Sequence, residues 1–169
     1  MGLRVAADSA IEGMASFFTF EEAGFGGYVA LTGALKGSGR LRLLLARIEE
    51  QMLKDGRGCQ GWFIECEPKG QELIFEHLGF REVAITYRQP PMSGQPFYAL
   101  ADAPALRLMY KEFGCRYDKP ELSCETFMNA VEWIFGAVYR LEKIKDSMFF
   151  NDIQQQIRNF EKGLIVFKV

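Results

Sequence analysis

A glycine-rich turn before a leucine-rich segment most strongly constrains how this chain can fold. After the break Gly37-Ser38-Gly39, aliphatic residues recur at the three- and four-residue spacing of a helix, at Leu41, Leu44, Leu45, Ile48 and Met52. Charged side chains fall largely on the rest of the helical wheel. Glycines and basic residues at 54–58 suit a helix end. The sequence therefore predicts an amphipathic helix that begins near residue 40 and ends near residue 54.

The segments on either side of this helix read as strands and a further short helix. Residues 15–20 and 28–32 are strand-like and flank glycines at 24, 26 and 27, which predicts a hairpin. Beyond the helix, a strand is expected at 62–66, a short helix at 71–78 and another strand at 83–87. The order of these elements alternates strand and helix up to about residue 90.

The chain changes character after residue 89. The prolines at 90, 91 and 96 cannot donate to a sheet ladder, so residues 89–96 are expected to form a connecting loop. A strand at 105–110 is possible. Apolar spacing then predicts one amphipathic helix over 127–138 and a less regular one over 141–160. The apolar segment at 164–167 could pair either with the sheet or with another chain.

Composition excludes several classes of function. The 169 residues suit one domain, and 20 basic against 22 acidic residues give a charge of −2, too weak to attract nucleic acid or an anionic membrane. The four cysteines form no C-x-x-C pair and His77 is the single histidine, so no metal site is expected. The cysteines are expected to be reduced, and the absence of a leader or spanning segment suggests a cytoplasmic protein.

The turn at 36–41 is a candidate anion site. The first N–H groups of a helix lack intrahelical partners, and glycines let a phosphate approach them. Lys36, Ser38 and Arg40 could add hydrogen bonds. A P-loop pattern is missing, and Arg42 stands where a dinucleotide fingerprint needs its third glycine. An ordinary strand-to-helix turn is the alternative.

The order of these motifs resembles the latter half of the GNAT superfamily of acyl-CoA N-acyltransferases. Gly37 and Gly39 match its Q/R-x-x-G-x-G/A motif, although Ala34 takes the Gln or Arg position, and Phe75 with Gly79-Phe80 matches a later aromatic–x–x–x–Gly–Phe pattern. The resemblance covers about residues 14–88. It implies an α+β fold of the three-layer α/β type, with a mixed twisted sheet, flanking helices and additional C-terminal helices. The expected organisation is an acyl-CoA-binding core at 1–90, a connection at 91–118 and a helical extension at 119–169.

The resemblance also implies where coenzyme A binds. The pyrophosphate would lie on the amides of the turn, and pantetheine would run between splayed parallel strands at 28–33 and 61–66. The implied cofactor-binding residues are Leu31, Gly33, Lys36, Gly37, Ser38, Gly39, Arg40 and Leu41. Acetyl or another acyl group would pass directly to a small-molecule or peptide amine, with no covalent enzyme intermediate.

Such a transfer needs a base for the amine and an acid for the leaving thiolate. Glu65 is the candidate base, Glu67 is the second choice, and Glu21 or Glu22 could also serve. For each of these residues the alternative is an ordinary solvated charge. Phe75 occupies the place of the family's usual tyrosine, so the proton would come from Tyr87, Tyr28, Cys66 or water, and Tyr87 is the candidate acid. Cys66 otherwise reads as a buried structural thiol, and His77 as a helix-end residue.

Phe75 and the short segment before the hairpin are two departures from the family pattern, and they favour other hypotheses. Few residues precede the hairpin, so the C-terminal helices or a second subunit, hence a homodimer, are expected to cover an otherwise unpaired strand edge. Aromatic residues at 127, 133, 135 and 139 are expected to pack in the core or at a dimer interface. The alternatives are therefore a catalytically inactive module for CoA binding or oligomerisation, and an unrelated α+β ligand-binding domain.

Overall fold

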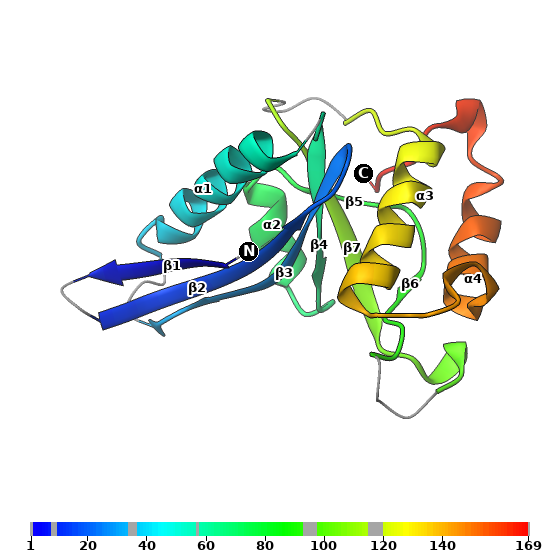
Figure 1. The fold of residues 1–169 in the computed structure, drawn as a ribbon, viewed down its shortest axis with the longest axis horizontal. Helices are drawn as coiled ribbons and strands as arrows, with labels where there is room; N and C mark the ends of the chain where they lie inside the picture. Colours follow the sequence, from blue (N-terminus) through cyan, green and yellow to red (C-terminus); the bar gives the residue numbers. More distant parts are fainter. Residues whose placement is uncertain are drawn as a thin grey trace. The chain divides into compact units, whose positions relative to one another are not determined.

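The computed structural model describes residues 2–7, 10–33, 37–56, 58–92, 98–114 and 120–168 (Figure 1). The chain divides into two compact units, Met1–Ile64 and Glu65–Val169. The first holds the strands β1 to β3, most of β4 and one long helix, and the second holds antiparallel strands with the remaining helices. This is the α+β class that the sequence predicts.

The sheet of the first unit begins with a strand that the sequence analysis missed. β1 (Gly2–Ala7) pairs antiparallel with β2 (Ala10–Thr19), which pairs antiparallel with β3 (Ala23–Leu31). β3 then pairs parallel with residues 61–64 of β4 (Gly61–Cys66). The expectation that no strand precedes the hairpin, and that other helices or a second subunit must cover its edge, is therefore wrong: β1 pairs with that edge.

The long helix packs as its sequence pattern indicates, and the predicted hairpin forms with its turn at residues 20–22; the glycines at 24, 26 and 27, predicted as the turn, lie in β3. α1 (Arg40–Asp55) buries Leu44, Leu45, Ile48 and Met52, and Figure 1 shows it alongside the hairpin strands. Met52 lies against Gly24 of β3, where a Cβ atom would come within 2.5 Å of its sulfur. The Trp62 indole of β4 donates to Glu49 Oε1 of α1 at 3.1 Å. An apolar face and one hydrogen bond thus fix the helix on the sheet.

We expect Gly56→Ala to lower the free energy of unfolding by about 1 kcal/mol, because the added methyl group has no room. Its Cβ atom would lie 2.6 Å from Cys59 Cβ and 2.9 Å from the Met52 carbonyl oxygen, and backbone cannot move aside cheaply. Urea denaturation measures the loss. Gly33→Ala is the control, since nothing lies within 4 Å of a Cβ atom there. Equal stability of both variants would contradict the packing argument.

The second unit is built around β7 (Ala105–Glu112), on which two short strands pair antiparallel. These are β5 (Arg81–Glu82) and β6 (Tyr87–Arg88). The strand predicted at 83–87 is therefore interrupted. Between the two pairings the chain advances from Glu82 to Tyr87 while its partner retreats only from Met109 to Leu106. The extra residues form an irregularity of the kind that redirects side chains beside functional sites.

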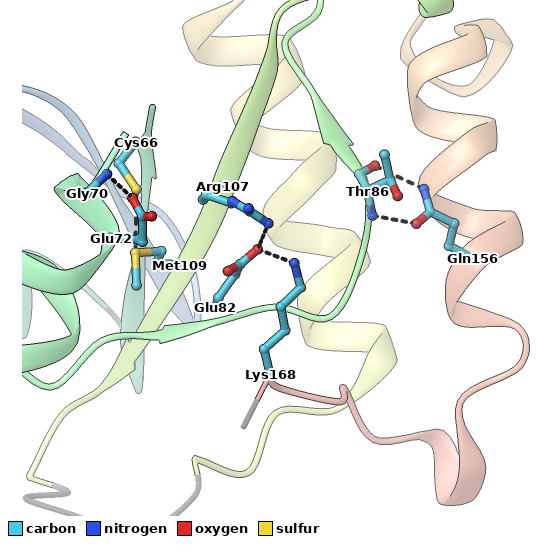
Figure 2. Close-up of polar contacts among 9 residues, drawn as sticks. All are labelled: Cys66, Gly70, Glu72, Glu82, Thr86, Arg107, Met109, Gln156 and Lys168. Carbon is cyan, nitrogen blue, oxygen red and sulfur yellow. Dashed lines mark hydrogen bonds and ion pairs between the residues drawn. The ribbon is translucent and has the colours of Figure 1, made fainter. Parts of the chain in front are cut away.

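The interruption is held by partners from the C-terminal part of the chain. Thr86 N–H donates to Gln156 Oε1 at 2.7 Å, and Gln156 Nε2 donates to the Thr86 carbonyl oxygen at 3.0 Å (Figure 2). The Ala84 N–H donates to the Val166 carbonyl, and the Lys168 N–H to that of Glu82, both at 2.8 Å. The terminal apolar segment thus pairs within its own unit, beside residues 82–84.

The helices of this unit differ in detail from the prediction. α2 (Gln71–His77) is terminated by Leu78 and Gly79, whose φ of 93° suits glycine, and the following Phe80 is fully buried. α3 (Cys124–Trp133) begins at Ser123, whose hydroxyl accepts from the Thr126 N–H, and runs into a π-helical turn, Ile134–Val138. The predicted second helix is shorter: α4 (Met148–Ile157) follows a separate 3₁₀ turn at Ile144–Asp146.

Candidate functional site

The glycine turn before α1 has the properties expected of an anion site. Gly37 and Gly39 have φ values of 76° and 74°, and nothing lies within 4 Å of a Cβ atom built on either. Gly39 caps the helix without a side-chain hydrogen bond, and no acidic residue stands in the first turn. Arg40 and Arg42 stand there instead, although the helix dipole disfavours cations at this end. A bound anion such as a diphosphate would offset that cost.

The other implied cofactor residues lie in the same unit. The parallel register runs from Ala23 opposite Gly61 to Gly26 opposite Ile64, whereas β3 continues to Leu31. Leu31 is half-buried, and Gly33 is exposed with open space around it. Gly37, Ser38, Gly39 and Arg40 are exposed and Leu41 is half-buried. Lys36 lies outside the described residues.

The second unit brings the candidate base and acid together. Tyr87, on β6, donates its hydroxyl hydrogen to Glu65 Oε1 over 2.5 Å. Tyr139, directly after the π-helical turn, donates to the other oxygen, Glu65 Oε2. Both tyrosines are only 2% exposed, and Glu65 is half-buried at the end of β4. One carboxylate is thus held by a tyrosine on each oxygen.

Burial governs the acid–base properties of this cluster. Desolvation raises the pKa of Glu65, while the hydrogen bonds from Tyr139 and Tyr87 act in the opposite direction. Burial, and then the charge of Glu65, raise the pKa of Tyr87 well above its usual value, and the same two causes raise the pKa of Tyr139. A carboxyl with a raised pKa is a better match for proton transfer near neutral pH.

The other carboxylates and the other tyrosine that the sequence offers as candidates are exposed. Glu67 is exposed and lies 3.5 Å from Lys69 in an ion pair. Glu21 and Glu22 are exposed in the turn between β2 and β3, and Tyr28 is exposed on β3.

The remaining candidates have structural surroundings. Burial raises the pKa of the Cys66 thiol to about 12, and its sulfur lies 3.5 Å from Met109 Sδ (Figure 2), so it stays protonated and is a poor nucleophile. His77 ends α2 and its Nδ1 donates to the Leu73 carbonyl oxygen. Phe75, at the position of the family's tyrosine, packs edge-on against Phe80.

Tyr139 is a residue of this cluster that the sequence pattern did not identify. Helical spacing assigns it, with Phe127, Phe135 and Trp133, to core or interface packing. Phe127 and Phe135 are indeed fully buried, but Trp133 is 51% exposed and the Tyr139 hydroxyl reaches Glu65. The sequence feature that could have identified it is a tyrosine in a segment whose other core aromatic residues are phenylalanines, because a buried hydroxyl needs a hydrogen-bond partner.

No group of three or more His, Cys, Asp or Glu side chains within the described part of the chain is placed to hold a metal ion. None of its helices is both long enough and apolar enough to cross a bilayer.

Comparison with known proteins gives the fold. No protein-family model and no curated sequence matches the chain. Solved structures do match: a protein of Bacteroides thetaiotaomicron described as a GNAT-family acetyltransferase is 19% identical, with a TM-score of 0.58 over 83% of this chain and 73% of that one. The ribosomal-protein-S18-alanine N-acetyltransferase of Escherichia coli is 16% identical, with a TM-score of 0.51 over 72% and 74%.

A third similar structure was solved with a ligand. It is a Bacillus subtilis acetyltransferase in complex with CoA, 15% identical, with a TM-score of 0.50 over 66% of this chain and 76% of that one. At these identities the likeness concerns the fold. Together with the order of strands, glycine turn and helices described above, it establishes that this chain has the fold of the GNAT superfamily.

Proposed function

We propose that this protein is an acyl-CoA-dependent N-acetyltransferase that transfers acetyl to a small-molecule or peptide amine by direct attack. The observation that carries the proposal is the Glu65–Tyr87 hydrogen bond of 2.5 Å, which joins a carboxylate with a raised pKa to a proton donor. Glu65 follows Ile64, the last β4 residue in register with β3. The chemistry that acetyl-CoA supplies is an activated acyl carbonyl with a thiolate leaving group.

The turn before α1 would hold the CoA diphosphate. The N–H groups of Gly39, Arg40 and Leu41 lie at a helix start whose N-cap residue is a glycine, and Arg40 adds a cation. Lys36, Gly37 and Ser38 complete the proposed diphosphate site, and the backbones of Leu31 and Gly33 would bind pantetheine. This assignment is supported by the open space at Gly37 and Gly39.

In the proposed mechanism Glu65 and Tyr87 act as one unit. Glu65 Oε1 takes a proton from the attacking amine, and Tyr87 Oη gives its proton to the leaving thiolate. The Glu65 carboxyl proton then passes to the Tyr87 oxygen, which restores both residues. The charge of Glu65 is one cause of the raised pKa of Tyr87, so protonation of Glu65 would make Tyr87 a stronger acid when the thiolate forms.

The proposal is tested by ligand binding and turnover together. CoA and acetyl-CoA should raise the melting temperature, because a ligand that binds only the folded state stabilises it by mass action. Thiol release from acetyl-CoA should then depend on an added amine. If the purified protein shows neither thermal stabilisation by these ligands nor amine-dependent thiol release, the proposal is wrong.

We expect Arg40→Gln to weaken CoA binding about tenfold, through loss of one charge-assisted contact with phosphate. Isothermal titration calorimetry gives the dissociation constant. Arg47→Gln is the matched control on the same helix, since Arg47 forms an exposed ion pair with Glu50. Equal affinities of the two variants would argue against a diphosphate at this turn.

A catalytically inactive module for CoA binding or oligomerisation is the second candidate. It is favoured by Phe75, which packs on Phe80 and has no proton to donate. Thermal stabilisation by CoA without thiol release from any amine would support it. A cytoplasmic location and a homodimeric state belong to the first proposal, and light scattering in solution tests the latter.

A further inference from the structure

The helical turn that carries Tyr139 has an irregular backbone. The Tyr139 N–H donates to the Ile134 carbonyl oxygen at 3.2 Å, five residues back, in place of the four-residue step of an α-helix. π-helical turns of this kind are rare and occur frequently at functional sites. The next residue, Arg140, has a φ of 58°, which is unusual for a residue with a Cβ atom. Irregular geometry therefore surrounds Tyr139 on both sides.

The Tyr139 hydroxyl is oriented by two partners. Its hydrogen is donated to Glu65 Oε2, and hydrogen bonding with the Gln89 side chain acts to lower the pKa of Tyr139. Gln89 is in turn tied at its main chain, where the Tyr98 hydroxyl donates to its carbonyl oxygen at 2.9 Å. The Tyr139 ring is fixed edge-on against Phe135, with 6.1 Å between ring centroids. Both the ring and the hydroxyl are thus held toward the carboxylate.

We propose that Tyr139 is a positioning residue for Glu65: it holds one carboxylate oxygen so that the other stays on Tyr87, which makes the C-terminal helical segment part of the catalytic unit. The inference rests on the proposed function for the role of Glu65. Because each carboxylate oxygen accepts one tyrosine hydrogen, rotation of the carboxyl group would break two hydrogen bonds at once. Each oxygen keeps a further lone pair for an amine hydrogen.

The test measures protonation of Glu65 directly. The protein is labelled with ¹³C at the glutamate carboxyl carbons, and the Glu65 signal is assigned by its loss in Glu65→Gln. The ionisable groups that act on the pKa of Glu65 are Tyr139 and Tyr87. Those that act on the pKa of Tyr139 are Glu65 and Tyr98. A hydrogen bond to the charged carboxylate lowers its pKa, so removal of the donor raises it.

We expect Tyr139→Phe to move the Glu65 titration midpoint upward by about one pH unit. Tyr98→Phe is the matched control, because it also loses a tyrosine hydroxyl, but one that bonds to Gln89 rather than to Glu65. In this variant the Glu65 titration midpoint should move by less than about 0.3 pH unit. Gln89→Leu, which keeps the Tyr139 ring, should give a smaller rise than Tyr139→Phe and serves if the first variant does not fold. An unchanged midpoint in the folded variants overturns the inference.

Activity separates this inference from the proposed function. If the unmodified protein transfers acetyl, Tyr139→Phe should lower kcat about tenfold and leave the KM for acetyl-CoA unchanged, because the turn before α1 is untouched. A rise in KM with an unchanged kcat would contradict a positioning role. If the unmodified protein transfers nothing while the midpoint still moves, the proposed function fails and the positioning of Glu65 by Tyr139 stands.

Discussion

Glu65→Gln is expected to reduce acetyl transfer by about 100-fold or more, since a positioned general base typically contributes that much. The amide keeps the size of the side chain and can still bond to Tyr87 and Tyr139, but it cannot accept the amine proton. Steady-state kinetics with acetyl-CoA and a reactive amine measures the loss. CoA affinity should not change, so calorimetry separates loss of catalysis from loss of binding.

The pH dependence sharpens this prediction. Burial raises the pKa of Glu65, and only the deprotonated form is a base, so activity should rise with pH through that raised value. The rise should vanish in the residual activity of Glu65→Gln. Because the pKa of Glu65 is higher in the folded state than in the unfolded state, its ionisation lowers the stability as the pH rises from the unfolded-state to the folded-state value. Glu65→Gln carries no charge at this position, so it should not be less stable than the unmodified protein at neutral pH.

Glu67→Gln is the matched control for this prediction. Glu67 lies two residues further along the chain, is exposed, and pairs with Lys69 rather than with a tyrosine. Its variant should keep most of the activity. Greater loss in Glu67→Gln than in Glu65→Gln would move the base to Glu67 and contradict our assignment.

Glu82→Gln is expected to lower the free energy of unfolding by about 2–3 kcal/mol. Glu82 is 8% exposed, and its Oε1 accepts from Arg107 Nη1 at 2.8 Å and from Lys168 Nζ at 2.5 Å (Figure 2). Breaking a buried ion pair leaves charge without compensation and costs about 3–5 kcal/mol, less here because both cations reach solvent. The buried Nε of Arg107 has no hydrogen-bond partner among the described residues, so its guanidinium depends on this carboxylate.

Chemical denaturation measures this loss, and a surface ion pair provides the comparison. Glu50 pairs with Arg47 at 2.7 Å on the exposed side of α1, and Glu50→Gln should cost less than about 1 kcal/mol. Lys168→Met should be milder than Glu82→Gln, because it removes one of two cations and leaves the pair with Arg107. If Glu82→Gln costs no more than Glu50→Gln, the cluster does not fasten the C-terminal segment as we describe.

The elements that could be predicted from sequence are those specified by neighbouring residues. The 3.6-residue period of Leu44, Ile48 and Met52 fixes α1. The two strand-like segments predict that β2 and β3 form a hairpin, but its turn lies at residues 20–22, and the glycines at 24, 26 and 27 belong to β3. Glu65 and Tyr87 could be named as candidates because their residue types suit proton transfer. Their hydrogen bond joins residues 22 positions apart, and no local pattern contains it.

The features that could not be predicted depend on distant partners. Residues 83–87 are rich in β-branched side chains, yet Thr86 bonds to Gln156, 70 positions away, and the strand is interrupted. β1 was missed because its sequence, GLRVAA, is short and holds one β-branched residue. Tyr139 was assigned to packing because helical spacing assumes a regular helix, and the π-helical turn changes the direction in which its side chain points.

The extra residue in the π-helical turn means that helix length, as well as residue identity, specifies the carboxylate cluster. Deleting one residue between Ile134 and Val138 would restore α-helical hydrogen bonding and turn everything after it by about 100°. Tyr139 would remain in the sequence but its hydroxyl would leave Glu65. A related chain that keeps every residue type of this site and lacks that insertion would therefore be expected to have lost the contact, so comparisons with relatives should weigh gaps as heavily as substitutions.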